Sequence, residues 1–62
     1  MPAEQPTPAP RVLVVDDHRK IRDPLATYLR RHGFEVRTAA DAAGLWQLLK
    51  QQVFDVAVLD VM

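Results

Sequence analysis

Three aspartates directly follow apolar runs of the sequence, and their side chains could do chemistry together. Asp16 and Asp17 come after "RVLVV", and Asp60 comes after "VAVL". Three carboxylates in one pocket repel one another, so either one takes up a proton or a cation binds. Oxygen ligands favour a hard ion, and Mg²⁺ suits a site with few carboxylates and several waters. A carboxylate beside Mg²⁺ can attack phosphorus and become an aspartyl phosphate.

A purely structural role is the alternative for each of these acids. A single aspartate after a strand is commonly a turn former or the N-cap of the next helix, and for Asp16 or Asp17 alone we favour that interpretation. It is weaker for the set of three, because all three acids fall at matching ends of two apolar runs.

The segments around the acids have the patterns of strands. Residues 12–15 and 56–59 are wholly apolar, as in strands that are buried on both faces. Residues 34–38, "FEVRT", alternate in polarity, which is typical of a half-exposed strand at a sheet edge.

A helix is predicted between the first two strands. Its apolar stripe consists of Ile21, Leu25, Tyr28 and Leu29. Gly33 suits the C′ position beyond the end of this helix. Pro24 is compatible with a start near Lys20 or Ile21, or with Asp23 as N-cap and Pro24 at N1.

A second helix is predicted before the last strand, within "AAGLWQLLKQQ". Asp41 can cap it, and three leucines should point inward: Leu45, Leu48 and Leu49. Trp46 lies beside that stripe and is interpreted as a packing residue, either within this domain or against further structure.

The predicted order is therefore β-α-β-α-β, an α/β fold. Short loops and intervening helices require parallel strands with right-handed crossovers. The alternating strand belongs at the edge and the two apolar strands side by side, which gives the strand order 2-1-3. Adjacent strands lie about 4.8 Å apart, so Asp16, Asp17 and Asp60 should converge at one edge of the sheet. Open α/β sheets bind their ligands at this topological switch point.

Composition limits the remaining possibilities. A chain of 62 residues allows one small domain, and the absence of cysteine excludes disulfides. The formal net charge is zero, so no overall basic field favours nucleic acid. No apolar run is long enough to span a membrane and residues 1–10 lack the features of a secretory signal, so we expect a cytoplasmic protein. Four prolines in residues 1–10 predict a disordered leader.

Residues 11–62 resemble the N-terminal part of a receiver domain from bacterial two-component response regulators. The resemblance rests on "VLVVDDH", "LRRHGFEV" and "FDVAVLDVM". It implies a flavodoxin-like, doubly wound parallel sheet, truncated here to its first three strands. It also implies that Asp60 accepts a phosphoryl group from a sensor histidine kinase. In that family the acid matching Asp17 ligates Mg²⁺ directly, the one matching Asp16 acts through water, and the backbone carbonyl matching Met62 completes the protein's share of the metal ligands.

A complete receiver has five strands, and the segments present here are most similar to regulators with a C-terminal winged-helix DNA-binding domain. We therefore expect DNA binding only through an effector domain outside this chain. The resemblance implies that a receiver catalyses only its own aspartyl phosphorylation and dephosphorylation, so we do not expect this chain to be an enzyme. The family's phosphoryl-binding Ser/Thr and Lys are missing, so we expect little phosphotransfer by the 62-residue chain alone. We also expect the third strand to expose an apolar edge, so that the chain self-associates or is completed by another chain.

Two alternatives to the phosphoacceptor function remain. A non-catalytic, receiver-like interaction scaffold would keep the fold without using the acids. A Mg²⁺-dependent phosphatase of the haloacid dehalogenase type needs D-x-D within one loop, whereas the loops here read "DDH" and "DVM". His18 is interpreted as a residue of the loop or first helical turn. The basic residues Arg19, Lys20 and Arg22 are interpreted as a solvated helix face, with docking of a partner as the second possibility.

Overall fold

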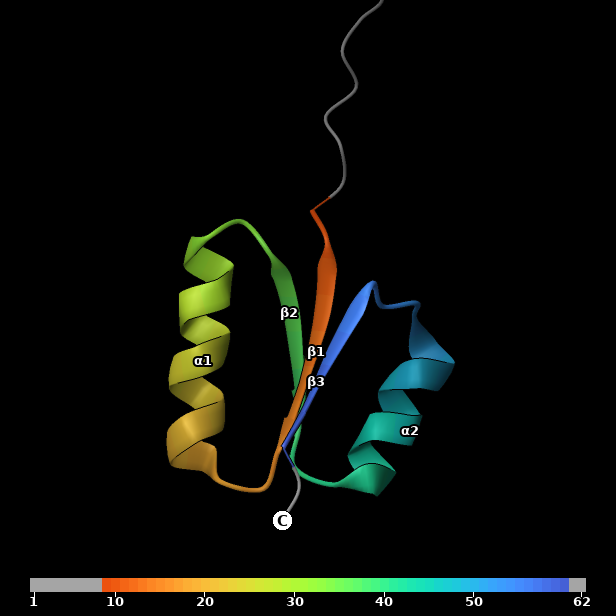
Figure 1. The fold of residues 1–62 in the computed structure, drawn as a ribbon. Helices are drawn as coiled ribbons and strands as arrows, with labels where there is room; N and C mark the ends of the chain where they lie inside the picture. The colour runs from red at the N-terminus through yellow and green to blue at the C-terminus, as the bar shows by residue number, and fades with distance from the viewer. Residues whose placement is uncertain (1–8, 61–62) are drawn as a thin grey trace, which may run out of the picture.

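The computed structural model describes residues 9–60, so the proposed leader lies outside the described residues except for its last two positions. The elements, in chain order, are β1 (Arg11–Asp16), α1 (Arg19–Arg31), β2 (Glu35–Ala39), α2 (Ala42–Gln51) and β3 (Val56–Asp60). This is the predicted β-α-β-α-β order (Figure 1). Within the described residues, no helix has the length and apolar character needed to cross a membrane.

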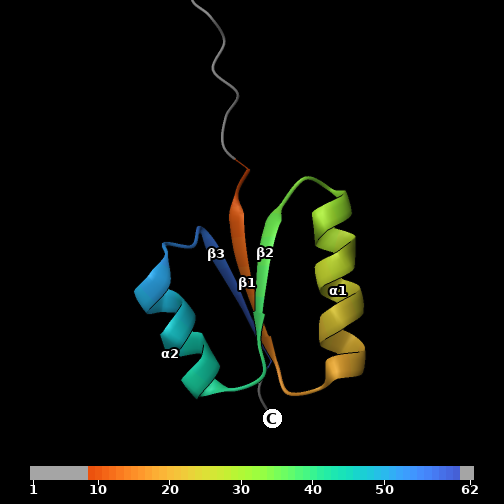
Figure 2. The same cartoon turned by 180° about the vertical axis from the view of Figure 1, so that it is seen from behind.

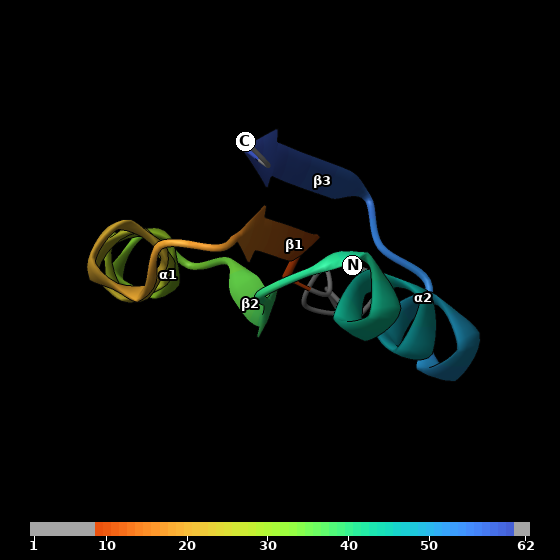
Figure 3. The same ribbon diagram turned by 90° about the horizontal axis from the view of Figure 1, so that it is seen from below.

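The three strands form one parallel sheet in the order β2-β1-β3, as predicted. The helices lie on opposite faces of this sheet, which is clearest when the sheet is viewed along its strands (Figure 3). The view from behind shows the same arrangement, with α1 and α2 on either side of the strands (Figure 2). This is a doubly wound α/β fold of the flavodoxin-like type.

The core has two halves, one on each face of β1. Towards α1, the buried residues Val12, Val14, Ala26 and Val36 pack with Leu25, Leu29 and Phe34. Towards α2, the buried residues Leu13, Val15 and Ala39 pack with Leu45, Leu48 and Phe54. β1 is therefore buried on both faces, as its apolar sequence predicts.

β3 is an exception to the predicted burial. All five of its residues are exposed, although four of them are apolar. Both helices pack on β1 and β2, and within residues 9–60 neither packs on β3. The prediction of a doubly buried third strand is therefore wrong for the described chain, whereas the expected exposure of its apolar side chains is observed.

α1 begins at Arg19, one residue before the nearer predicted start. His18 is its N-cap, and the His18 carbonyl accepts hydrogen bonds from the backbone N–H groups of Ile21 and Arg22. The option of Asp23 as N-cap is therefore wrong. Pro24 lies in the second turn, where it removes the N–H donor that would bond to the Lys20 carbonyl.

The buried face of α1 differs from the predicted stripe. Leu25 and Leu29 pack on the core as predicted, but Ile21 and Tyr28 are exposed and Ala26 is buried in their place. The end of α1 is a Schellman motif: the Gly33 N–H bonds to the Arg30 carbonyl and the Phe34 N–H to the Leu29 carbonyl. Gly33 has a φ of 89°, the conformation predicted for it.

α2 follows its predicted start more closely. Asp41 is the N-cap, and its Oδ1 accepts a hydrogen bond from the Gly44 N–H at 2.8 Å. Leu45 and Leu48 pack on the core as predicted. Leu49 is exposed, so its predicted inward position is wrong, and Trp46 is 61% exposed and does not pack within the described domain.

Candidate functional site

The carboxyl ends of β1 and β3 bring two of the predicted acids opposite each other. In the parallel register, Asp16 is the partner of Asp60, just as Val12 is the partner of Val56 at the other end. The residue Asp16 is only 3% exposed, because it ends the central strand of the described sheet. Asp60 is exposed, at the end of the outer strand.

Asp17 and His18 extend the site beyond β1. The backbone N–H of His18 donates to Asp16 Oδ1 at 2.8 Å, which folds the turn back over the strand end. His18 Nδ1 lies 2.9 Å from Asp17 Oδ1 and 3.4 Å from Asp16 Oδ1. We call these three residues the Asp-Asp-His cluster. Each offers a ligand atom, and the three atoms all lie within 4.8 Å of one another.

The donor atoms of the cluster are of the kinds that bind divalent ions. Two carboxylates supply hard oxygen donors, as Mg²⁺ prefers, and the imidazole supplies a nitrogen donor. A buried carboxylate needs hydrogen bonds or a cation to offset its lost hydration, and Asp16 has one backbone N–H donor within the described residues. The carboxylates present therefore fit the ion that the sequence indicates. Of the other two predicted ligands, Asp60 is the register partner of Asp16, and Met62 lies outside the described residues.

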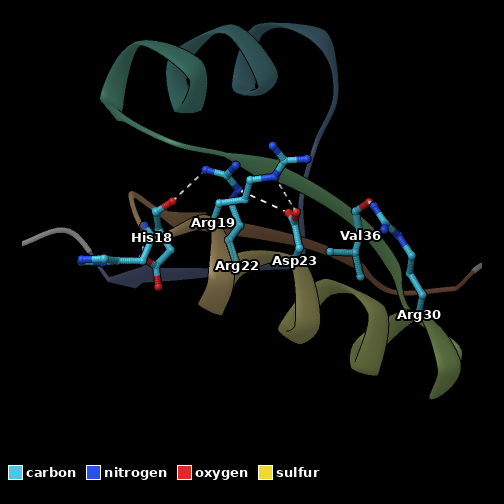
Figure 4. A network of polar contacts seen from close by, with 7 residues as sticks. His18, Arg19, Arg22, Asp23, Arg30 and Val36 are labelled. Carbon is cyan, nitrogen blue, oxygen red and sulfur yellow. Dashed lines mark hydrogen bonds and ion pairs between the residues drawn. The ribbon is translucent and has the colours of Figure 1, made fainter.

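Arg22 connects α1 to this end of the sheet. Its Nη1 donates to the backbone carbonyl of Asp16 at 3.0 Å, and its side chain is only 16% exposed (Figure 4). The interpretation of Arg22 as part of a solvated face is therefore wrong. Arg19 and Lys20 are exposed, as that interpretation requires, and Arg19 Nε pairs with Asp23 at 3.1 Å. The one-turn spacing from His18 to Arg22 could have indicated that Arg22 reaches back to the strand end.

The contribution of His18 was also missed from the sequence. A histidine after two aspartates was interpreted as an ordinary loop residue, but as the N-cap of α1 it stands beside both carboxylates. The adjacent pair "DDH" was the available signal, because a turn at the end of a strand brings consecutive side chains together. A surface hollow on α1, lined by residues such as Pro24 and Tyr28, does not include Asp16, Asp17 or Asp60.

Comparison with known proteins identifies the family. Residues 12–62 match the response regulator receiver domain. The chain is 45% identical over 51 residues to the transcriptional regulatory protein GltR of Pseudomonas aeruginosa, covering 82% of this chain and 21% of that protein. It is 45% identical over 53 residues to protein PetR of Rhodobacter capsulatus, covering 86% of this chain and 22% of that protein.

A third relative comes from Enterococcus gallinarum. The regulatory protein VanRc of Enterococcus gallinarum is 36% identical over 52 residues, covering 84% of this chain and 22% of that protein. The chain thus spans about a fifth of the length of these curated relatives. No solved structure gave a significant match. Because the family match covers most of the chain, the chain belongs to the response regulator receiver domain family of two-component systems.

Proposed function

We propose that this chain is the phosphoacceptor part of a receiver, in which Asp60 takes a phosphoryl group from a sensor histidine kinase with the help of Mg²⁺. The observation that carries the proposal is the register of the sheet, which sets Asp60 opposite the buried Asp16. The family match over residues 12–62 supports the same role. It also favours a receiver over a haloacid dehalogenase-type phosphatase.

In the proposed reaction, a carboxylate oxygen of Asp60 attacks the phosphorus of a phosphohistidine. A new P–O bond forms, the P–N bond breaks, and the imidazole of the kinase leaves with the bonding electron pair. Asp16, Asp17, Asp60 and the carbonyl of Met62 would hold the ion. When bound, Mg²⁺ neutralises charge on the transferring phosphoryl group. The receiver thus catalyses its own modification, and the kinase supplies the phosphoryl group.

The names of two relatives support a proposal about the output of the receiver. GltR is a transcriptional regulatory protein by name, and PfeR of Pseudomonas aeruginosa, 34% identical over 55 residues, is a transcriptional activator protein. We propose that phosphorylation of Asp60 controls transcription in the cytoplasm, and that DNA is bound by an effector domain outside this chain.

The direct test is Asp60→Asn, with Asp55→Asn as the matched control. Asp55 also flanks β3, but at the opposite end, where its carboxylate accepts from the Arg11 backbone N–H at 2.8 Å. The protein at its full natural length is incubated with acetyl phosphate or the cognate kinase, and phosphorylation is followed by intact mass. Asp60→Asn should abolish the added phosphate and Asp55→Asn should keep it. Unchanged phosphorylation of Asp60→Asn would refute the proposal.

A second proposal concerns the partner of β3. Its apolar side chains are exposed, with Val56 at 53% and Leu59 at 60%, and an exposed apolar edge strand is a template for pairing. We propose that β3 pairs with a further strand, and that the 62-residue chain alone obtains one by self-association. Sedimentation velocity should then show dimers or larger species. A cooperatively unfolding, monodisperse monomer would contradict this proposal.

A further inference from the structure

The imidazole of His18 is placed for a role beyond the end of the helix. His18 is the N-cap of α1, but its side chain makes no capping hydrogen bond. Its Nδ1 instead lies 2.9 Å from Asp17 Oδ1 and 3.4 Å from Asp16 Oδ1. The imidazole therefore lies beside the same carboxylates that would hold the ion of the proposed site.

These separations match those between ligands of one metal ion. Bonds of about 2.1 Å place neighbouring corners of an octahedron about 3.0 Å apart, which is the spacing required for a shared divalent ion. The two distances from His18 Nδ1 lie close to this value. The Nδ1 of His18 therefore lies at ligand spacing from one oxygen of each carboxylate, and the three atoms all lie within 4.8 Å of one another.

The main chain holds this arrangement in place. The backbone N–H of His18 donates to Asp16 Oδ1 at 2.8 Å, and Arg22 donates to the Asp16 carbonyl at 3.0 Å. Neither of these two hydrogen bonds involves the Nδ1 of His18 or the carboxylate of Asp17. A turn that is fixed through its backbone presents its side chains to an ion at lower entropic cost than a mobile one.

We propose that His18 is a third side-chain ligand, through Nδ1, beside Asp16 and Asp17. This inference rests on the proposed metal-dependent function and adds a specificity to it. Imidazole suits the later first-row transition ions better than it suits Mg²⁺, which prefers oxygen. His18 therefore raises the affinity for an ion such as Co²⁺ more than the affinity for Mg²⁺. Nδ1 binds through its lone pair, and any proton on it is released to solvent.

A different role for His18 makes the opposite prediction. If the imidazole acted only as a charge partner of the two carboxylates, it would compete with every divalent ion. Its removal would then tighten the binding of Mg²⁺ and Co²⁺ alike. Under our proposal, removal of the imidazole weakens the binding of Co²⁺ selectively.

The experiment measures CoCl₂ and MgCl₂ binding to the full chain by calorimetry, together with the visible absorption of bound Co²⁺. His18→Gln removes the nitrogen ligand, and His32→Gln is the control because His32 is the C-cap at the far end of α1. His18→Asn is the second variant, because asparagine is a favourable N-cap and so preserves α1. Both His18 variants should lose on the order of tenfold in Co²⁺ affinity, which corresponds to about 1.4 kcal/mol, and about twofold or less in Mg²⁺ affinity.

The Co²⁺ absorption spectrum should change in both His18 variants and remain unchanged in His32→Gln. Unchanged Co²⁺ affinity and spectrum in the His18 variants would overturn this inference, as would tighter binding of both ions. If the wild-type chain binds Mg²⁺ and the His18 variants have the same Co²⁺ affinity as the wild type, only the inference about His18 fails. If the wild-type chain binds neither ion, the proposed metal-dependent function fails with it.

Discussion

Replacement of Arg22 by methionine tests the contact that ties α1 to the acid end of the sheet. The guanidinium donates to the Asp16 carbonyl at 3.0 Å from a side chain that is 16% exposed. A hydrogen bond from a charged donor contributes about 1.5–3 kcal/mol. Methionine keeps an unbranched stem and a similar helix propensity, so packing and propensity change little. We therefore expect Arg22→Met to lower the free energy of unfolding by about 2 kcal/mol.

This loss is large compared with the stability of so small a fold. The described chain runs from residue 9 to residue 60, and about 0.05–0.15 kcal/mol per residue gives a total of roughly 3–8 kcal/mol. Urea unfolding followed by the fluorescence of Trp46 measures the change. With an m value of about 1 kcal/mol/M, the midpoint should fall by about 2 M.

Asp23→Ala is the matched control for Arg22→Met. Asp23 lies 3.7 Å from the Arg22 Nε, and its side chain is 52% exposed. Exposed ion pairs contribute about 0–1 kcal/mol, so Asp23→Ala should cost much less than Arg22→Met. If the two variants lose the same stability, the bond to the Asp16 carbonyl is not what Arg22 contributes, and the reasoning is refuted.

Three further variants test the local structure by urea unfolding. Gly33→Ala should cost about 1–2 kcal/mol because φ is 89° while a Cβ there would meet no atom within 4 Å; a neutral effect would contradict this. Leu13→Ala should cost about 2–5 kcal/mol at a fully buried position, against under about 1 kcal/mol for the exposed Leu49→Ala, and equal losses would argue against the described core. Asp41→Ala should cost about 1 kcal/mol and Asp41→Asn much less, because asparagine also accepts from the Gly44 N–H; equal losses would exclude the cap.

The strand order could be predicted from polarity patterns, although the burial of the strands could be predicted only in part, since residues 56–59 are as apolar as residues 12–15 and yet β3 is exposed. A wholly apolar run at 12–15 requires burial on both faces, and an alternating run at 34–38 tolerates an edge. The caps could be predicted for a similar reason. Asp41 and Gly33 each satisfy a local backbone requirement that depends on a few neighbouring residues.

Which side chains of each helix are buried was predicted less well, because it depends on the elements that the helix packs against. Both α1 and α2 carry more apolar residues than β1 and β2 can cover, so Ile21, Tyr28 and Leu49 remain exposed. The start of α1 also depends on its surroundings. Pro24 suggested a later start, but the His18 carbonyl accepts two N–H groups of the first turn, and the helix accommodates proline in its second turn. The apolar periodicity of α1 does not reveal the contact of Arg22 with the Asp16 carbonyl, for which the one-turn spacing from His18 was the available signal.

The two facing aspartates of the site have different surroundings, and the difference matches the roles proposed for them. Asp16 is 3% exposed at the end of β1, where it is the register partner of Asp60 and its carboxylate accepts from the backbone N–H of His18, the N-cap of α1. A residue that holds an ion gains from being fixed, because less entropy is lost on binding. Asp60 is exposed at the end of β3. A phosphoacceptor has to be reached by the phosphohistidine of another protein, which a carboxylate as deeply buried as Asp16 would hinder. The parallel register thus sets a buried carboxylate opposite an exposed one, which suits the phosphoryl transfer proposed for this site.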